Sequence, residues 1–305
     1  MLWVLALLSA LLVGFAGDTR TELLVARNQY ENARARALAD AGVSLAAVGV
    51  LDPAPESQFP ADGTPHRFQY GDGTISVRVQ DDAGKIDLNA AAPELLANLM
   101  RTLGIADADA AAMAQSIANW RRDHLTYPPQ DGRNLVPAPG RPPGAAFEAV
   151  EQLRLVPGMT RALYDRLFPY ITIYSGLPDV DPLTASEVVL RSLPGINAQD
   201  IPAFIAQRQQ AITNPDALPS LAGVGFLAHR PVQAATIISE GRTQTGALFA
   251  REAVLVITRE PATPYHIVAW RQAQHDEQAM ADADATSSAP AAPLGNRRSP
   301  DRGHD

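Results

Sequence analysis

The sequence predicts an α+β fold in which a long N-terminal helix precedes an antiparallel sheet, with a large helical region inserted between the strands of that sheet. Three observations predict it. Residues 2–51 are first apolar and then amphipathic with no Pro, two pairs of strand-like segments lie far apart in the sequence, and helical patterns fill the interval between them. The 305 residues contain 46% apolar side chains, which is enough for a packed core.

Composition excludes several classes of function. A net charge of −8 without a basic block argues against broad attraction to nucleic acid or anionic lipid, and favours protein partners. Because there is no Cys, disulfides, Cys-ligated zinc, iron–sulfur clusters and thiol nucleophiles are excluded. The six His residues show no metal-ligand spacing, and no phosphate-binding loop or G-x-S-x-G motif occurs. We therefore predict that the chain is not an enzyme.

The first stretch, residues 2–17, has no charged side chain. At about 1.5 Å per residue it is about 24 Å long, somewhat less than the ~30 Å hydrocarbon core of a membrane. Three interpretations compete: a buried soluble helix, the core of a cleaved signal peptide, and a retained membrane anchor. No basic segment precedes the apolar run and Phe15-Ala16-Gly17-Asp18 is a poor cleavage site, so a retained anchor is favoured.

Beyond Asp18, apolar residues recur about 3.6 positions apart along one face of a continuing helix. They are Leu23, Ala26, Tyr30, Ala33, Ala37, Ala41, Leu45 and Val48. We predict that this helix packs against neighbouring subunits, although packing against its own domain is the alternative and both can hold along one length. The candidate assembly residues are Leu5, Leu8, Leu12, Phe15, Leu23, Tyr30, Ala37 and Leu45.

The charges around the apolar stretch conflict with a periplasmic soluble part. Four Arg residues follow the stretch (Arg20, Arg27, Arg34 and Arg36) and no basic residue precedes it. The positive-inside rule would then place the soluble part in the cytoplasm. Either the orientation is inverted or the true start of the protein lies upstream of Met1.

Two strand pairs are predicted to form the sheet. Residues 67–70 and 74–80 alternate in hydrophobicity around the turn Gly71-Asp72-Gly73, as expected for a β-hairpin. Residues 250–258 and 265–270 form the second pair. The sheet is therefore predicted to be split around an insertion.

Related turns occur between helical runs of the predicted insertion: Leu103-Gly104-Ile105, Pro157-Gly158 and Pro194-Gly195. They resemble helix–hairpin–helix elements, whose free backbone N–H groups can hold a DNA phosphate. The acid Asp200 beside the expected phosphate position and the lack of a second Gly after the turn argue against that use. A membrane-anchored DNA-binding receptor is nevertheless the alternative function from a different class.

Acidic residues offer weak candidates for a cation site. Asp81, Asp82 and Asp87, or Asp123 and Asp131 beside the Pro- and Gly-rich loop 128–144, could ligate calcium, but no EF-hand spacing occurs. Solvated surface acids are the favoured interpretation of both groups, and Asp123 and Asp131 remain the weak calcium candidates.

Four segments together resemble the minor pseudopilin K family of bacterial type II secretion systems. They are residues 3–16 (WVLALLSALLVGFA), 81–100 (DDAGKIDLNAAAPELLANLM), 147–176 (FEAVEQLRLVPGMTRALYDRLFPYITIYSG) and 180–196 (VDPLTASEVVLRSLPGI). The resemblance implies a pilin-type antiparallel sheet and a large inserted all-α domain. The expected division is 1–51 N-terminal helix, 52–84 first part of the sheet, 85–241 insertion, 242–275 second part of the sheet and 276–305 a disordered tail.

The resemblance also implies a role. Such a subunit caps the tip of a short periplasmic pseudopilus, assembles with minor pseudopilins I and J through the N-terminal helices, and supports export of folded proteins across the outer membrane. It would cross the inner membrane once, with its soluble domain in the periplasm. Secreted cargo or the outer-membrane channel are further conceivable contacts, and nucleic acid is not an expected partner.

Two departures from the family pattern stand out. Family precursors begin with a short basic leader ending in Gly, which prepilin peptidase removes, and no such leader precedes Met1. An upstream start would account for both the short apolar stretch and the charge asymmetry.

Some members also bind calcium in the inserted domain, but here Asn119, Arg122 and Arg133 stand where acids would help. Calcium is therefore a weak expectation, and no other cofactor is expected.

Overall fold

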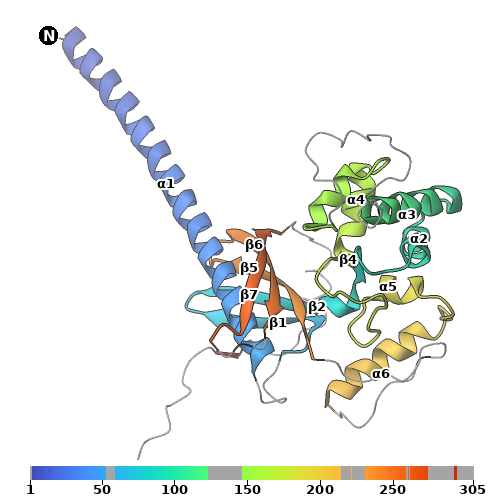
Figure 1. The fold of residues 1–305 in the computed structure, drawn as a ribbon. Helices are drawn as coiled ribbons and strands as arrows, with labels where there is room; N and C mark the ends of the chain where they lie inside the picture. The colour runs from blue at the N-terminus through green and yellow to red at the C-terminus, as the bar shows by residue number, and fades with distance from the viewer. Residues whose placement is uncertain are drawn as a thin grey trace, which may run out of the picture.

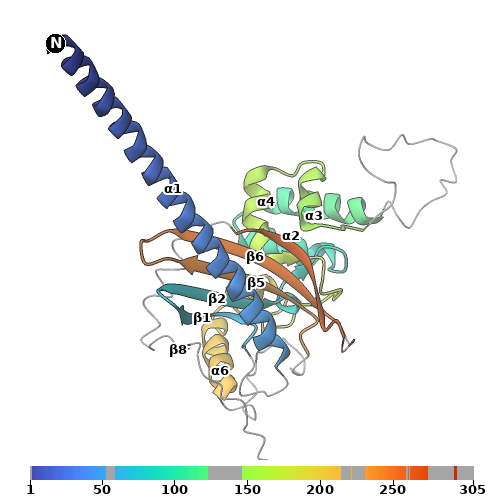
Figure 2. The same cartoon turned by 90° about the vertical axis from the view of Figure 1, so that its left-hand side faces the viewer.

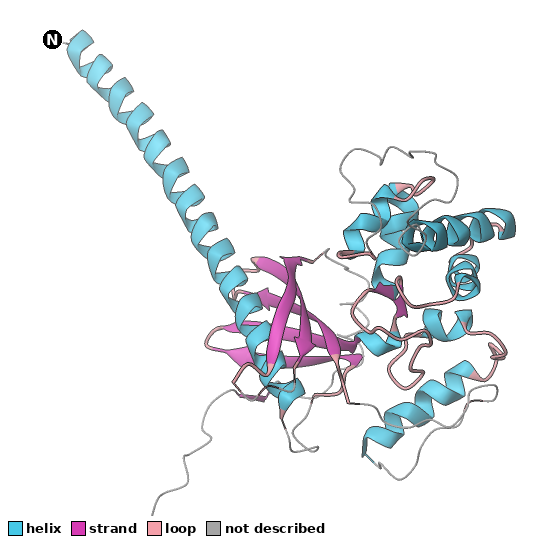
Figure 3. Cartoon of the chain, in the orientation of Figure 1, coloured by secondary structure: helices cyan, strands magenta, loops and turns pink. Residues whose placement is uncertain are grey.

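The computed structural model describes residues 2–52, 59–122, 146–213, 221, 231–258, 260, 262–273 and 292–293; within α1, the side chains of residues 5–20 are not described. The elements, in chain order, are α1 (Leu2–Leu51), β1 (Asp62–Tyr70), β2 (Gly73–Asp81), η1 (Asp82–Gly84), β3 (Ile86–Asp87), α2 (Pro93–Thr102), α3 (Asp107–Arg122), η2 (Val150–Leu155), α4 (Arg161–Leu167), η3 (Phe168–Tyr170), β4 (Ile171–Thr172), α5 (Glu187–Ser192), α6 (Ile201–Thr213), β5 (Ala234–Arg242), β6 (Leu248–Ile257), β7 (Tyr265–Gln272) and β8 (Ala292–Pro293). Figure 3 shows these helices and strands by colour.

The helix α1 is continuous over 50 residues, which confirms the predicted helix of residues 2–51. Its N-terminal half projects away from the rest of the protein, and its C-terminal half lies along the sheet (Figure 1). Among the residues that the structure describes, no helix combines the length and the apolar character needed to span a membrane.

Five antiparallel strands form the main sheet in the order β7-β6-β5-β2-β1, and the two residues of β8 pair in parallel with β1. The hairpin β1–β2 is confirmed, with Gly71 at φ 60° in its turn. The pair β6–β7 is also confirmed. The central strand β5 was not predicted, and all but its last residue lies within residues 85–241, which the sequence assigned to the insertion.

A helical region connects β2 to β5. It contains helices α2 to α6 among the described residues, together with a short parallel ladder between β3 and β4. It has its own apolar core, to which Leu96, Leu99, Ile117, Leu153 and Phe204 contribute fully buried side chains. Figure 2, turned so that α1 faces the viewer, shows α1 in front of the sheet and helices α2 to α4 behind it. We call residues 82–233 the insertion below.

Two predictions fall where the structure is not described. The calcium candidates Asp123 and Asp131, and the loop 128–144, lie outside the described residues. The same holds for the predicted disordered tail apart from β8. Within the part of the chain that is described, no cluster of three or more metal-binding side chains occurs.

Candidate assembly surface and the junction with the insertion

One face of α1 packs closely on the sheet because its side chains there are small. Ala35, Ala39 and Ala46 are completely buried, and Gly42 lies among them. A Cβ added to Gly42 would lie against Ser239 and 2.6 Å from the Cγ2 of Ile75. Opposite, a Cβ on Gly241 would meet the carbonyl of Ala35. Glycine on both sides therefore allows the helix and strand β5 to approach at backbone distance.

The apolar side chains beneath this face form the core of the sheet. In β2 the alternation predicted from the sequence is confirmed, because Ile75, Val77 and Val79 are all buried against α1. Val43 and Val50 of α1 belong to the same cluster. The burial of these aliphatic groups supplies the main apolar stabilisation of the contact between helix and sheet.

The predicted assembly residues lie on the other face of α1. Leu23 is 66% exposed and Tyr30 65% exposed, Ala37 is exposed, and Leu45 is half-buried. The neighbouring positions of the predicted apolar face, Ala26, Ala33, Ala41 and Val48, are exposed as well. We call these eight residues the exposed stripe. Leu5, Leu8, Leu12 and Phe15 lie in α1, and their side chains are outside what the structure describes.

Polar contacts position α1 along the sheet. Arg34 forms an ion pair with Asp72 in the β1–β2 turn, and Nε of Arg251 lies 2.7 Å from Oδ1 of Asp40. The guanidinium of Arg251 also lies 4.9 Å from the ring centroid of Trp270 in β7. These contacts connect α1 to the β1–β2 turn and to β6, whose Arg251 also contacts β7, so they define the position of the exposed stripe relative to the sheet.

The opposite face of the sheet is polar and meets the insertion. Since side chains alternate along a strand, Glu252 points away from α1 when Arg251 points toward it. Arg271 donates to Oε1 of Glu252 and to Oε1 of Glu151 in η2, both at 2.6 Å, and its guanidinium lies 4.6 Å from the ring centroid of Phe168. This one side chain therefore connects the sheet to the insertion.

Buried acids mark the point where the insertion begins. Asp82 is 1% exposed, and its carboxylate accepts hydrogen bonds from Thr236 at 2.6 Å and from Thr172 at 2.5 Å. Nζ of Lys85 lies 2.9 Å from Oδ1 of Asp82 and donates to Thr236 at 2.5 Å. These contacts join η1 to β4 and β5, so the ion pair is held between the insertion and the sheet.

The interpretation of Asp81, Asp82 and Asp87 as solvated surface acids was wrong. Asp81 is 2% exposed, and Asp87 is 1% exposed. Asp87 accepts hydrogen bonds from the backbone N–H groups of Asn89, Ala90 and Gly176 and from the hydroxyl of Ser175. Buried carboxylates are stable when such donors satisfy them. The sequence could not show that Ser175 and Gly176 are donors, because both are distant from Asp87 along the chain.

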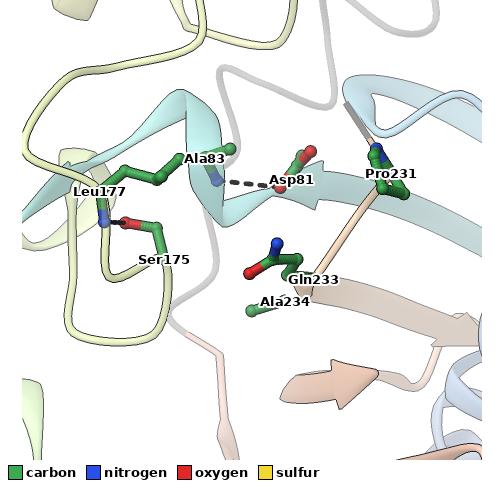
Figure 4. Close-up of a pocket in the computed structure, with 7 residues that line it drawn as sticks. All are labelled: Asp81, Ala83, Ser175, Leu177, Pro231, Gln233 and Ala234. Atoms are coloured by element: carbon green, nitrogen blue, oxygen red, sulfur yellow. Dashed lines mark hydrogen bonds between the residues drawn. The ribbon is translucent and has the colours of Figure 1, made fainter. Parts of the chain in front are cut away.

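A small cavity of about 70 Å³ lies beside Asp81. Its lining comes from the sheet and from the insertion alike: Asp81, Ala83, Ser175, Leu177, Pro231, Gln233 and Ala234 (Figure 4). Burial raises the pKa of Asp81 to about 7; the backbone N–H of Ala83 opposes the rise, and the carboxylates of Asp181 and Asp82 add to it.

Comparison with known families identifies the region around this junction. Residues 77–176 match the model of the type II secretion system protein K family. The match covers this segment of the chain. The matched segment runs from within β2 into the loop after β4, so it includes the buried acids Asp81, Asp82 and Asp87. Proteins of this family are non-enzymatic structural components, in agreement with the prediction that the chain is not an enzyme.

Other comparisons add little. A search of curated protein sequences found no match. A chain in the crystal structure of the GspK-GspI-GspJ complex from the type 2 secretion system of enterotoxigenic Escherichia coli is similar with a TM-score of 0.45 and 16% sequence identity, covering 85% of this chain and 100% of that chain. A similarity of this size supports no conclusion about this protein.

The predicted hairpin turns are exposed turns between helical segments. Gly158 has φ 88° and Gly195 has φ 79°, and both follow an exposed Pro, at positions 157 and 194. Gly104, in the weaker third turn, has φ 78°. Glycine is favoured at such angles because a Cβ would be strained. Flanking apolar residues pack on the core of the insertion, as Val156 and Met159 do around Gly158. In the described residues, the visible role of these turns is to reverse the chain.

Proposed function

We propose that this protein is the minor pseudopilin at the tip of a type II secretion pseudopilus, where it assembles with minor pseudopilins I and J and supports export of folded periplasmic proteins across the outer membrane. The match of residues 77–176 to the protein K family carries the proposal. In this role the protein needs no catalytic group and no cofactor. Its contribution is a surface that other subunits recognise.

The proposed assembly element is α1. Its exposed stripe presents apolar side chains on the face away from the sheet, and the half of α1 before residue 35 has no buried side chain among those described. Apolar surface exposed on a long helix is stabilised when a second helix covers it. We propose that the helices of I and J pack there.

We propose further that the N-terminal end of α1 anchors the protein in the inner membrane, crossing it once, with the sheet and the insertion in the periplasm. The support is the uncharged stretch of residues 2–17, which includes Leu5, Leu8, Leu12 and Phe15. The basic leader that the family resemblance implies is part of this proposal.

The proposed domain arrangement follows the family. The sheet would be the pilin-type sheet, interrupted by an all-α domain with helix–hairpin–helix-like turns. The proposed boundaries are those predicted from the sequence, except that the insertion begins at residue 82, after β2, and ends at residue 233, because β5 pairs with β2 and β6. The insertion would form the outer surface of the tip, where cargo or the outer-membrane channel is met.

Deleting the gene should abolish secretion of folded proteins across the outer membrane while export across the inner membrane continues, and the intact gene should restore it. A deletion strain that secretes normally contradicts the proposal.

A second experiment tests the stripe. The double variant Leu23→Asp/Tyr30→Asp should lose copurification with I and J, because charge on the stripe opposes apolar packing. The matched control is Asn32→Asp, which is exposed on the opposite side of the same helix and should still copurify. Equal recovery of I and J with the double variant and the control would refute assembly through the stripe.

A further inference from the structure

The insertion is connected to the sheet at two places that lie side by side. The chain leaves the sheet at Asp81, the last residue of β2, and returns at Ala234, the first residue of β5. Asp81 and Ala235 are directly paired in the β2–β5 ladder. A change in the orientation of the insertion relative to the sheet therefore has to be absorbed by the backbone at this point.

The cavity beside Asp81 lies between these two connections. Ser175 and Leu177 of the insertion form one part of its wall, and Pro231 and Gln233 form another part next to β5 (Figure 4). One oxygen of Asp81 accepts from the N–H of Ala83 at 2.9 Å. Among the residues that the structure describes, its second oxygen has no hydrogen-bond partner. An ionised Asp81 would be solvated only by one backbone N–H and by the little water that a 2% exposed side chain reaches, which is less than a carboxylate requires.

The charges around Asp81 do not compensate for the poor solvation of its ionised carboxylate. Asp82 and Asp181 face it as further buried acids. The nearby cation, Lys85, is paired with Asp82. Farther out, the guanidinium of Arg208 in α6 interacts with the carboxylates of Asp62 and Asp181, and the carboxylate of Asp87 is satisfied by four donors. With Asp81 charged, the site would hold more negative charge than Lys85 balances.

We propose that the junction between the insertion and the sheet is controlled by a proton on Asp81: the junction is closed while the carboxyl is neutral, and it opens when the carboxyl ionises and water enters the cavity. Arg271 keeps the insertion attached through Glu151 in both states. The opening is thus a local loosening around residues 81–83 and 231–235.

The sign of the pH dependence follows from the direction of the shift. The pKa of Asp81 is raised from 3.8 to about 7 in the closed state. The closed state binds the proton more tightly than the open or unfolded state, whose carboxyl ionises near its ordinary value. The closed state is therefore favoured fully below about pH 4, loses stability as the pH rises toward 7, and changes no further above that.

Hydrogen exchange of the full chain from pH 5 to pH 8, corrected for the intrinsic pH dependence of amide exchange, tests the proposal. Two amides report on the junction: the N–H of Asp181 donates to the carbonyl of Ala83, and that of Ile257 donates to the carbonyl of Gln233, both at 2.8 Å. In the wild type their protection should fall more than about tenfold across this range. In Asp81→Asn, which keeps the shape without the ionisable group, protection should not change with pH.

The matched control is Asp179→Asn, an exposed acid near Asp181, which should keep the wild-type pH dependence. If Asp81→Asn and the wild type lose protection equally, or if the wild type loses none, the proposal is wrong. Should Asp81→Asn fail to fold, the ¹³C chemical shift of the Asp81 carboxyl in the wild type decides: a midpoint near 7 supports the proposal and one below about 5 overturns it. No measurement here involves I or J, so failure would leave the proposed function untouched.

Discussion

The sheet is covered on its two faces by interfaces of opposite chemistry. Against α1 the contact consists of small and aliphatic groups, with Gly42 and Gly241 at the closest approach. Against the insertion it consists of Asp82, Lys85 and Arg271 with their hydrogen-bond partners. The first interface depends mainly on volume, with the ion pairs Arg34–Asp72 and Arg251–Asp40 beside the apolar contact, whereas the second depends on pairing and protons. The insertion is thus attached mainly through groups that conditions can change.

The largest effect is expected from breaking the polar interface at its centre. Lys85→Met leaves the carboxylate of Asp82 buried without its cation, which should lower the free energy of unfolding by about 3–5 kcal/mol. Urea unfolding at pH 7 measures this loss in the free energy of unfolding. The double variant Lys85→Met/Asp82→Leu should recover part of the loss, because no buried charge remains. A loss below about 1 kcal/mol for the single variant would show that this interface is not held by the pair.

Disrupting the apolar interface should lower the free energy of unfolding by a somewhat smaller amount. Gly42→Leu places a side chain where a Cβ already meets Ser239 and Ile75, so the free energy of unfolding should fall by about 1–3 kcal/mol. The control is the neighbouring exposed residue, Ala41→Leu, which should leave stability nearly unchanged. The same midpoint of thermal unfolding for both variants would mean that α1 does not approach the sheet this closely.

A smaller loss is expected at the edge of the polar interface. Arg271→Met removes both ion pairs but leaves an aliphatic side chain on Phe168, so we expect a loss of about 1–2 kcal/mol. Because the pairs are partly exposed, the loss should shrink as salt is added. Unfolding by urea at low and high salt measures this, and a loss independent of salt would argue for packing over charge.

The smallest effect is expected on the exposed stripe. Val48→Ser should change the free energy of unfolding by no more than about 0.5 kcal/mol, because the side chain is 68% exposed. Val43→Ser, on the buried face of the same helix, should cost several times more. Thermal unfolding of the two variants side by side measures the contrast between the faces. Equal effects would mean that the assignment of the two faces is incorrect.

The elements that the sequence predicted were those with local signals. The alternation in β2 and the glycines of its turn predicted the first hairpin, and the family resemblance rested on a segment that includes the junction. Strand β5 was missed because eight of its nine residues are buried or half-buried, so it lacks the alternation that marks a strand with one exposed face.

The sequence by itself determined that α1 is long and continuous and that its apolar residues recur with helical periodicity, because those properties depend on neighbours along one helix. Only the tertiary structure decided which face meets the sheet. The face with Gly42 does so, because Gly42 and Gly241 allow the helix and strand β5 to approach closely, and most of the exposed stripe stays open to solvent. The tertiary structure likewise decided that Asp81, Asp82 and Asp87 are buried, because the groups that satisfy or surround them, such as Thr172, Ser175 and Thr236, come from distant parts of the chain.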